Sequence, residues 1–289
     1  MKKVLVLGGK GMAGHLVTRY LKGRGKYHVA QAARGIVESS DSYSVDVADK
    51  KMLDDLLVAL KPDIIINCIG ILNSDAEDHP DKAIFINSYL PHCLAQKIKS
   101  FGGRLIQIST DCVFSGKKGN YTEFDTKDGV GIYAQSKALG EVSYDGHLTI
   151  RTSIIGPELN KKGIGLLHWF LTNSSQTIKG YSNAFWSGVT TLQLSYAIEN
   201  AIDDSEIFGL VHLTNGIKIS KHDLLILINR IFKTDKVVEA FPDYYFDKSL
   251  LVGFLSYRLG SVPSYEQMLE ELKFWMYENV DLYRENYNF

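Results

Sequence analysis

Residues 4–14 read Val-Leu-Val-Leu-Gly-Gly-Lys-Gly-Met-Ala-Gly, a short apolar run that ends in a cluster of glycines. An apolar run of this length, bounded by turn-forming residues, is typical of a buried strand. In residues 12–22 the apolar side chains then recur at helical spacing, until Gly23-Arg24-Gly25 ends the pattern. The stretch therefore predicts a strand, a tight glycine turn and a helix.

The same alternation continues along the first half of the chain. We expect further strands at residues 28–33, 63–71, 104–109 and 148–152, with helices at 49–60, 80–100 and 133–144 between them. Alternating strands and helices predict an α/β fold with a doubly wound parallel sheet of the Rossmann type.

The rhythm changes after Gly156-Pro157. Helices are expected at 163–173, 190–203, 220–232 and 265–277, with a strand at 209–213. We interpret residues 1–157 as a dinucleotide-binding domain and residues 158–289 as a smaller, mixed α/β substrate-binding part. Some segments of the second part are expected to return and pack on the first. The tail from residue 283 onward is expected to be a surface end.

Composition excludes several classes of protein. The chain has 289 residues, with 33 acidic and 32 basic side chains, a net charge of -1 and 45% hydrophobic residues. Without a basic cluster we expect no nucleic-acid partner, and no apolar run approaches the roughly 20 residues that cross a bilayer. Three cysteines without C-x-x-C spacing indicate neither a disulfide framework nor a metal site, so a cytoplasmic protein is expected. A homodimer is left open.

The glycine turn predicts where a phosphate group binds. Glycine lets the backbone turn sharply and approach a pyrophosphate, while the following helix directs its free amides toward the phosphates. The residues expected to contact the cofactor here are Gly8, Gly11, Met12, Ala13 and Gly14.

Arg34 bears on the choice of cofactor. In dinucleotide folds an acid roughly 20 residues beyond the glycines binds the ribose hydroxyls of NAD, whereas an Arg accommodates the 2'-phosphate of NADP. Arg34 occupies that place, and no acid lies within three residues of it. The sequence therefore favours NADP(H), with NAD(H) as the weaker alternative.

Tyr133 and Lys137 are the candidate catalytic pair. Four positions apart on a helix, they share one face. Thr110 ends the preceding strand, at the sheet edge where ligands of open α/β folds bind. A lysine ammonium beside a phenol favours the phenolate, so Lys137 is expected to lower the pKa of Tyr133. The same spacing occurs at Tyr244 and Lys248, which we interpret as structural because no strand edge is nearby.

Together these residues resemble the extended short-chain dehydrogenase/reductases. The stretches Ser109-Thr110-Asp111-Cys112-Val113-Phe114-Ser115-Gly116, Tyr121-Thr122-Glu123 and Tyr133-x-x-Ser136-Lys137-x-x-Gly140-Glu141 look like the dTDP-4-dehydrorhamnose reductase branch. The likeness covers about the first 157 residues, and includes Asp46-Val47 where the family holds adenine, Ile69-Gly70 beside the cofactor, and Asn87.

The resemblance implies a function and roles for single residues. The function is NADPH-dependent reduction of a nucleotide-linked 4-keto-6-deoxy sugar for polysaccharide or other glycan precursor synthesis. Tyr133 donates the proton, Lys137 supports it and contacts a ribose, and Thr110 polarises the substrate carbonyl. Thr110, Asp111 and Trp186 are expected to contact substrate, Trp186 as a wall of the nucleotide pocket.

Two alternatives stay open. One is an epimerase of the same superfamily, which keeps its cofactor bound. The other is a regulatory subunit that binds NADP without turnover, against which the intact set of Thr110, Tyr133 and Lys137 weighs. Dehydratases of this group carry Glu where this chain has Cys112, so elimination of water is disfavoured.

Overall fold

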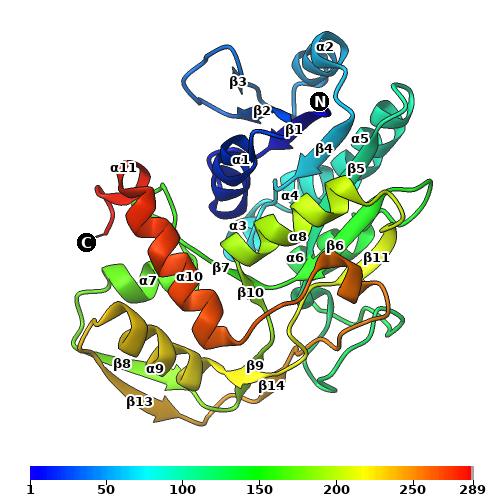
Figure 1. Ribbon diagram of the computed structural model, residues 1–289. Helices are drawn as coiled ribbons and strands as arrows, with labels where there is room; N and C mark the ends of the chain where they lie inside the picture. Colours follow the sequence, from blue (N-terminus) through cyan, green and yellow to red (C-terminus); the bar gives the residue numbers. More distant parts are fainter. Residues whose placement is uncertain (288–289) are drawn as a thin grey trace.

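The computed structural model describes residues 1–287, which contain a seven-stranded parallel sheet (Figure 1). The strand order is β11-β6-β5-β4-β1-β2-β3. The strands are β1 (Lys3–Leu7), β2 (His28–Ala33), β3 (Ser42–Ser44), β4 (Ile64–Asn67), β5 (Arg104–Thr110), β6 (Leu148–Thr152) and β11 (Gly209–His212). The predicted doubly wound α/β fold is confirmed.

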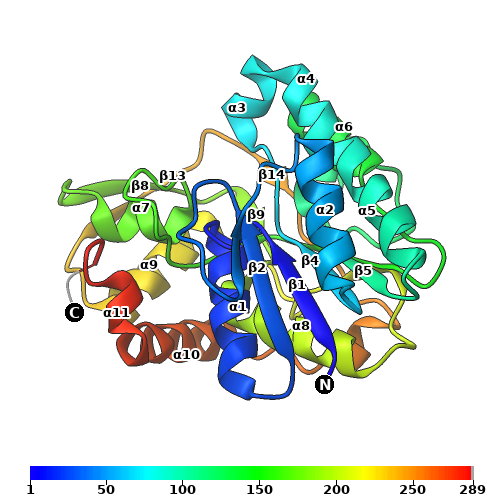
Figure 2. The ribbon, with the colours of Figure 1, turned by 90° about the horizontal axis from the view of Figure 1, so that it is seen from above.

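Helices cover both faces of this sheet (Figure 2). The helices α1 (Met12–Arg24) and α8 (Thr191–Asp203) lie on one face, and α2 (Lys50–Leu60), α5 (Leu90–Lys99) and α6 (Ile132–Leu139) lie on the other. The strands supply a core to each side, because successive side chains of a strand point to opposite faces. Val4 and Val6 pack in the core beneath α1 and α8, whereas Leu5 and Leu7 pack in the core beneath α2 and α5. Burial on both faces explains the continuous apolar run at residues 4–7.

The second half of the chain contributes to both parts of the molecule. β11 pairs with β6 at the edge of the main sheet, and α8 packs against α1. The remainder forms a smaller mixed part with a three-stranded sheet of order β12-β9-β14 and the pairs β13-β8 and β10-β7. Its elements are β7 (Ile154–Ile155), α7 (Leu166–Thr172), β8 (Thr177–Tyr181), β9 (Ala184–Trp186), β10 (Val189–Thr190), β12 (Ile219–Ser220), α9 (Lys221–Phe232), β13 (Val237–Phe241), β14 (Phe246–Asp247), η3 (Ser256–Leu259), α10 (Tyr265–Glu278) and α11 (Val280–Tyr283). The division at residue 157 stays a prediction.

The predicted helix at 80–100 is not one regular helix. After α3 (Asn73–Asp78), α4 (Pro80–Ala83) passes into a π-helical turn, η1 (Ile84–Tyr89), and only then into α5. The predicted strand at 63–71 stops at Asn67, where the chain leaves the sheet. A short 3-10 turn, η2 (Asp111–Val113), follows β5.

The expectation of a surface tail from residue 283 is wrong for the described residues. Tyr283 and Tyr287 are buried. The Tyr283 hydroxyl lies 3.0 Å from His15 Nε2 in α1, and the Tyr287 hydroxyl lies 2.7 Å from His168 Nδ1 in α7. The aromatic rings fill space between these helices. Residues 288 and 289 lie outside the described part of the chain.

No helix within residues 1–287 has the length and apolar character needed to cross a bilayer.

Candidate active site

A cleft of about 390 Å³ lies at the carboxyl ends of the central strands. Four segments that are far apart in the sequence meet there: the glycine turn, the end of β4, the end of β5 and the first turns of α6. The predicted residues that line the cleft are Gly11, Met12, Ala13, Ile69, Gly70, Thr110, Asp111, Tyr133 and Lys137. In parallel sheets this edge collects the ligand-binding loops.

The glycine turn has no room for larger side chains. Gly8 has a φ of +89°, and a Cβ on Gly14 would lie 2.2 Å from the Gly8 carbonyl oxygen. Gly14 thus lets the turn pack directly on α1. That helix begins without a side-chain cap and without an acidic residue in its first turn. Its free amides and positive dipole end therefore fit the phosphates of a dinucleotide.

The residues that were expected near the rest of the cofactor lie along the same edge. Arg34 is exposed immediately after β2, and the Gly8 amide donates to the Ala32 carbonyl of that strand at 2.8 Å. Lys10 adds a second cation beside the loop of Arg34, which the sequence analysis did not single out. Its Nζ donates to the Gly35 carbonyl at 3.1 Å. Asp46 accepts from the Ala48 amide.

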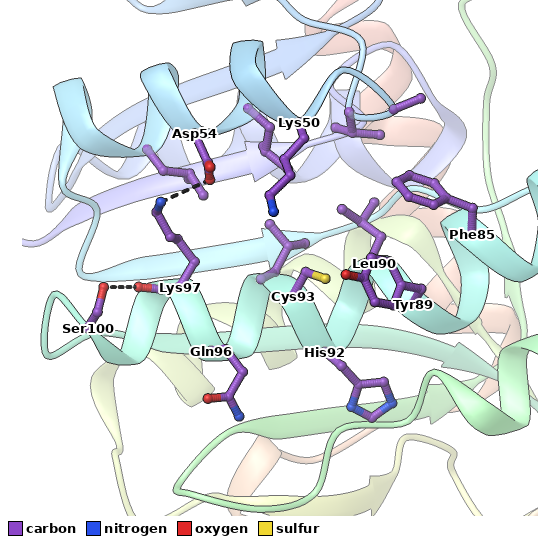
Figure 3. Close-up of a pocket in the computed structure, with 15 residues that line it drawn as sticks. Lys50, Asp54, Phe85, Tyr89, Leu90, His92, Cys93, Gln96, Lys97 and Ser100 are labelled. Carbon is purple, nitrogen blue, oxygen red and sulfur yellow. Dashed lines mark hydrogen bonds and ion pairs between the residues drawn. The ribbon is translucent and has the colours of Figure 1, made fainter.

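Val47 borders a second cavity, of about 660 Å³, between α2 and α5. Figure 3 shows side chains of the two helices facing each other across it, with the Lys97–Asp54 ion pair spanning one end. Its lining is largely apolar and contains none of Thr110, Tyr133 or Lys137. The smaller cleft at the strand ends is therefore the candidate active site.

Thr110, Tyr133 and Lys137 come together as the sequence predicts. The Thr110 hydroxyl interacts with the Tyr133 phenol. The Thr110 hydroxyl also accepts from the Cys112 amide and donates to Asp111 Oδ1, each at 3.1 Å. Lys137 Nζ donates to the Ile108 carbonyl at 2.7 Å. A hydroxyl, a phenol and an ammonium thus line one cleft.

The pKa of Tyr133 differs from the expectation. Burial of the phenol raises its pKa, and the nearby Cys112 and Asp111 act in the same direction against the hydrogen bond from Thr110. Burial also lowers the pKa of Lys137 to about 8. The prediction that Lys137 lowers the pKa of Tyr133 is therefore wrong for this structure. Tyr133 is a protonated phenol at neutral pH.

Asn87 in η1 fixes the position of α6. Its Oδ1 accepts from the Ile71 amide at 2.9 Å, and its Nδ2 donates to the Ile71 carbonyl and, at 3.1 Å, to Ser136 Oγ. Glu77 of α3, which the sequence analysis missed, accepts from the Tyr133 amide at 3.3 Å. One amide side chain thus joins the loop after β4 to the helix of Tyr133.

A buried ion pair lies behind the catalytic strand. Arg151 is fully buried in β6, where it donates two hydrogen bonds to Glu141 at 2.7 and 2.8 Å. Glu141 also accepts from Ser109. His212 of β11 lies 2.9 Å from Arg151 Nη1, and burial lowers its pKa to about 4, so its neutral ring accepts the bond. The network fixes three neighbouring strands.

The predicted substrate residues separate into two groups. Thr110 and Asp111 line the cleft, and Asp111 is buried. Trp186 is only 5% exposed, packs against Tyr265 in the core and does not line the cleft. Its contact with substrate stays a prediction. Among residues 1–287, no group of three or more His, Cys, Asp and Glu side chains could hold a metal ion.

The pair Tyr244 and Lys248 does not form a second catalytic site. These residues lie outside any helix, and Tyr244 is exposed beside Tyr181. Lys248, however, interacts electrostatically with Cys112 and Asp111. The structure therefore separates a surface tyrosine from a lysine close to the cleft.

A parallel sheet with this glycine turn and a Thr-Tyr-Lys set at its carboxyl edge defines an oxidoreductase fold of the extended short-chain dehydrogenase/reductase class. Within that class the chain belongs to the RmlD substrate binding domain family, which matches residues 1–247.

Relatives with names and solved structures agree with this family. The dTDP-4-dehydrorhamnose reductase of Aggregatibacter actinomycetemcomitans is 25% identical over 254 residues, 84% of this chain and 83% of its own. The methionine adenosyltransferase 2 subunit beta of Xenopus tropicalis is 22% identical over 265 residues, 83% of this chain and 78% of its own. The structure is similar to dTDP-4-dehydrorhamnose reductase from Bacillus anthracis in complex with NADP, with a TM-score of 0.81, 22% identity and coverage of 95% of this chain and 99% of that one.

Proposed function

We propose that the protein is an NADPH-dependent reductase of a nucleotide-linked 4-keto-6-deoxy sugar. The observation that carries the proposal is that Thr110, Tyr133 and Lys137 line the same cleft as the glycine turn. Family membership and the relatives that are named reductases support the same reaction.

The residues of this chain divide the work between binding and proton transfer. NADPH, when bound, supplies the hydride. The amides at the start of α1 hold phosphate, and Arg34 with Lys10 favours the extra 2'-phosphate. Thr110 holds the carbonyl oxygen as negative charge develops on it, and Tyr133 delivers the proton that completes the hydroxyl. Lys137 lines the same cleft, where its ammonium would contact the ribose of the cofactor.

The test supplies NADPH together with 4-keto sugars made enzymatically from dTDP-glucose and from UDP-N-acetylglucosamine. We expect stoichiometric oxidation of NADPH with one of them, followed by absorbance, and a new hydroxyl at carbon 4 of the sugar. The sugar that is accepted identifies the nucleotide. Tight binding of NADPH without oxidation by either sugar would contradict the proposal.

A second candidate follows from the relative that is named a subunit of methionine adenosyltransferase. A regulatory subunit of that kind would bind the cofactor and a partner chain without turnover. The same assay separates the two functions, because only a reductase consumes NADPH.

A further inference from the structure

Two lysines of the smaller part lie near Asp111, which lines the cleft. Lys221 is the first residue of α9, and Lys248 follows β14. Both interact electrostatically with Asp111, which lines the cleft immediately after Thr110. The sequence analysis interpreted Lys248 as structural and did not single out Lys221, and both lysines are far from Asp111 along the chain.

Direct packing holds this group together. The Asp247 amide donates to the Gly116 carbonyl at 2.7 Å, so β14 is attached to the loop that follows β5. A Cβ on Gly116 would lie 3.0 Å from Phe246 Cβ and 3.2 Å from Lys248 Cγ. The Lys221 ammonium lies 5.2 Å from the centre of the Phe246 ring. The lysine stems are therefore fixed against the same loop that carries Thr110 and Asp111.

The charges in this group do not balance. Two ammonium groups face a single carboxylate, and burial raises the pKa of both Asp111 and the Cys112 thiol, so neither adds readily to the negative charge. The neighbouring carboxylate of Asp247 is already bonded to Lys218 at 2.6 Å. Among residues 1–287, the Lys221 ammonium has no hydrogen bond or ion pair, and it interacts with the Phe246 ring and with Asp111. Partly buried cations without a matching anion are costly unless a ligand supplies the charge.

We propose that Lys221 and Lys248 form the anion-binding pair for the diphosphate of the nucleotide sugar. This assignment rests on the proposed function. The diphosphate is attached to carbon 1 of the sugar, across the ring from carbon 4. With carbon 4 at Thr110 and Tyr133, the diphosphate extends past Asp111 toward the two lysines. Anchoring it there holds the ketone in place during reduction.

The experiment measures nucleotide binding apart from catalysis. Calorimetric titrations with dTDP, UDP and thymidine compare the wild type with Lys221→Met, Lys248→Met and the double variant. Each single variant is expected to weaken binding of the preferred diphosphate roughly tenfold, and the double variant more, while thymidine binding is unchanged. The loss should shrink at high ionic strength. The matched control is Lys179→Met, since Lys179 also lies over an aromatic ring, Phe241, but at an exposed position.

Further measurements keep this inference separate from the reductase proposal. Lys221→Arg should restore most of the affinity, which a variant that simply folds poorly would not show. Diphosphate affinity that is unchanged in both variants, or an equal loss for thymidine, would overturn the inference even if the wild type is an active reductase. A wild type that binds dTDP or UDP through these lysines, yet reduces no 4-keto sugar, would support the inference and contradict the reductase proposal.

Discussion

For Tyr133 and Lys137, the shared helix face follows from the local sequence, whereas the pKa values depend on residues from other segments. Their spacing of four predicts a shared helix face, and the structure confirms it. The direction of the Tyr133 pKa shift was not predictable, because the desolvation that raises it comes from residues of other segments of the chain. Tyr133 carries a proton to donate at neutral pH, but the raised pKa makes the phenol a weaker acid, since efficient proton transfer favours a pKa near the working pH.

Tyr133→Phe is therefore expected to remove the proton donor while leaving the cleft intact. We expect turnover to fall by about 10²–10⁴-fold, the contribution of a positioned acid, with little change in NADPH affinity. Steady-state kinetics and fluorescence titration measure the two quantities. Tyr244→Phe is the control and should keep full activity, because Tyr244 is exposed and lies outside the cleft. The reverse pattern would contradict the assignment.

Lys137→Met is expected to abolish activity and to stabilise the fold. Burial lowers the pKa of Lys137 to about 8, so the unfolded chain binds this proton more tightly than the folded protein. At high pH the amine of Lys137 is neutral and its burial costs little. This part of the free energy of unfolding is lost as the pH falls through about 8, the pKa of the folded state. At about pH 7 the charged lysine thus costs roughly 1–3 kcal/mol.

Thermal unfolding across pH checks this expectation. The gain in stability of Lys137→Met over the wild type should be largest near neutral pH and should shrink toward about pH 10. Lys179→Met, at an exposed position, should show neither effect. A variant that is less stable than the wild type at neutral pH would show that the Lys137 bond to Ile108 outweighs the cost of burying its charge.

Arg34→Ala tests the choice of cofactor. We expect affinity for NADPH to fall about tenfold while affinity for NADH stays nearly constant, since only NADPH carries the 2'-phosphate that a guanidinium binds. Fluorescence titrations with both cofactors give the ratio. Because Lys10 lies close to the same loop, the double variant Arg34→Ala/Lys10→Ala should lose more selectivity than either single change. Equal affinities in the wild type would remove the basis of this expectation.

The contact between α6 and η1 positions the catalytic side chains. Gly140 ends α6, and a Cβ there would lie 1.8 Å from the Asn87 carbonyl oxygen. Gly140→Ala must therefore move α6 away from η1. A displacement of Tyr133 by about 1 Å is expected to lower kcat about 10²-fold. Kinetics and thermal unfolding should show both a loss of activity and a loss of stability. Gly23→Ala, where a Cβ meets open space in α1, should leave activity unchanged and slightly raise stability.

The sequence pattern predicted a helix at residues 80–100, near the contact between α6 and η1. It did not predict the shape of that helix. Apolar residues in 80–100 repeat at helical spacing through α4, η1 and α5, so periodicity alone does not reveal the π-helical turn. The turn places Asn87 and Ser88 where they bond α6 and the loop after β4. Those bonds are tertiary contacts, and a single sequence contains no direct signal for them. The resemblance to a family marked Asn87, but it did not mark Ser88 or Glu77.

The ion pair of Arg151 and Glu141 lies in a network that joins β6 to β5 through Ser109 and to β11 through His212. Burial alone would raise the pKa of Glu141, but the hydrogen bonds and charge of Arg151 outweigh it, and the pKa lies below its usual range. Glu141→Gln leaves the Arg151 charge buried without a counter-ion. We expect the free energy of unfolding to fall by about 3–5 kcal/mol.

Chemical denaturation at two pH values checks this loss. A carboxylate with a lowered pKa stabilises the fold above its unfolded pKa, and that stability is lost as the pH falls through the folded value. The difference between wild type and Glu141→Gln should therefore shrink below about pH 4. Glu266→Gln, in an exposed pair with Arg230, should cost under about 1 kcal/mol. A difference that is independent of pH would assign the effect to packing instead of charge.

Across the molecule, long buried elements were predictable and short ones were not. Residues 4–7 appeared as a strand because burial on both faces leaves an apolar run, whereas residues 104–109 and 148–152 were predicted from their place in the alternation of strands and helices. β8 and β13 pair with each other outside the main sheet, and β12 and β14 have two residues each, too few for a periodic pattern. The position of Lys221 and Lys248 beside Asp111 was not predicted either, since a charge imbalance exists only once the chain has folded.

The burial of Tyr283 against His15 affects the order in which contacts can form while the chain is synthesised on the ribosome. His15 Nδ1 bonds the Gly11 carbonyl at the glycine turn, and its other nitrogen contacts the Tyr283 hydroxyl. Tyr283 follows His15 by 268 residues along the chain. A nascent polypeptide can therefore assemble β1, α1 and β2 early, but the imidazole that supports the glycine turn gains this partner only after those 268 residues have been added.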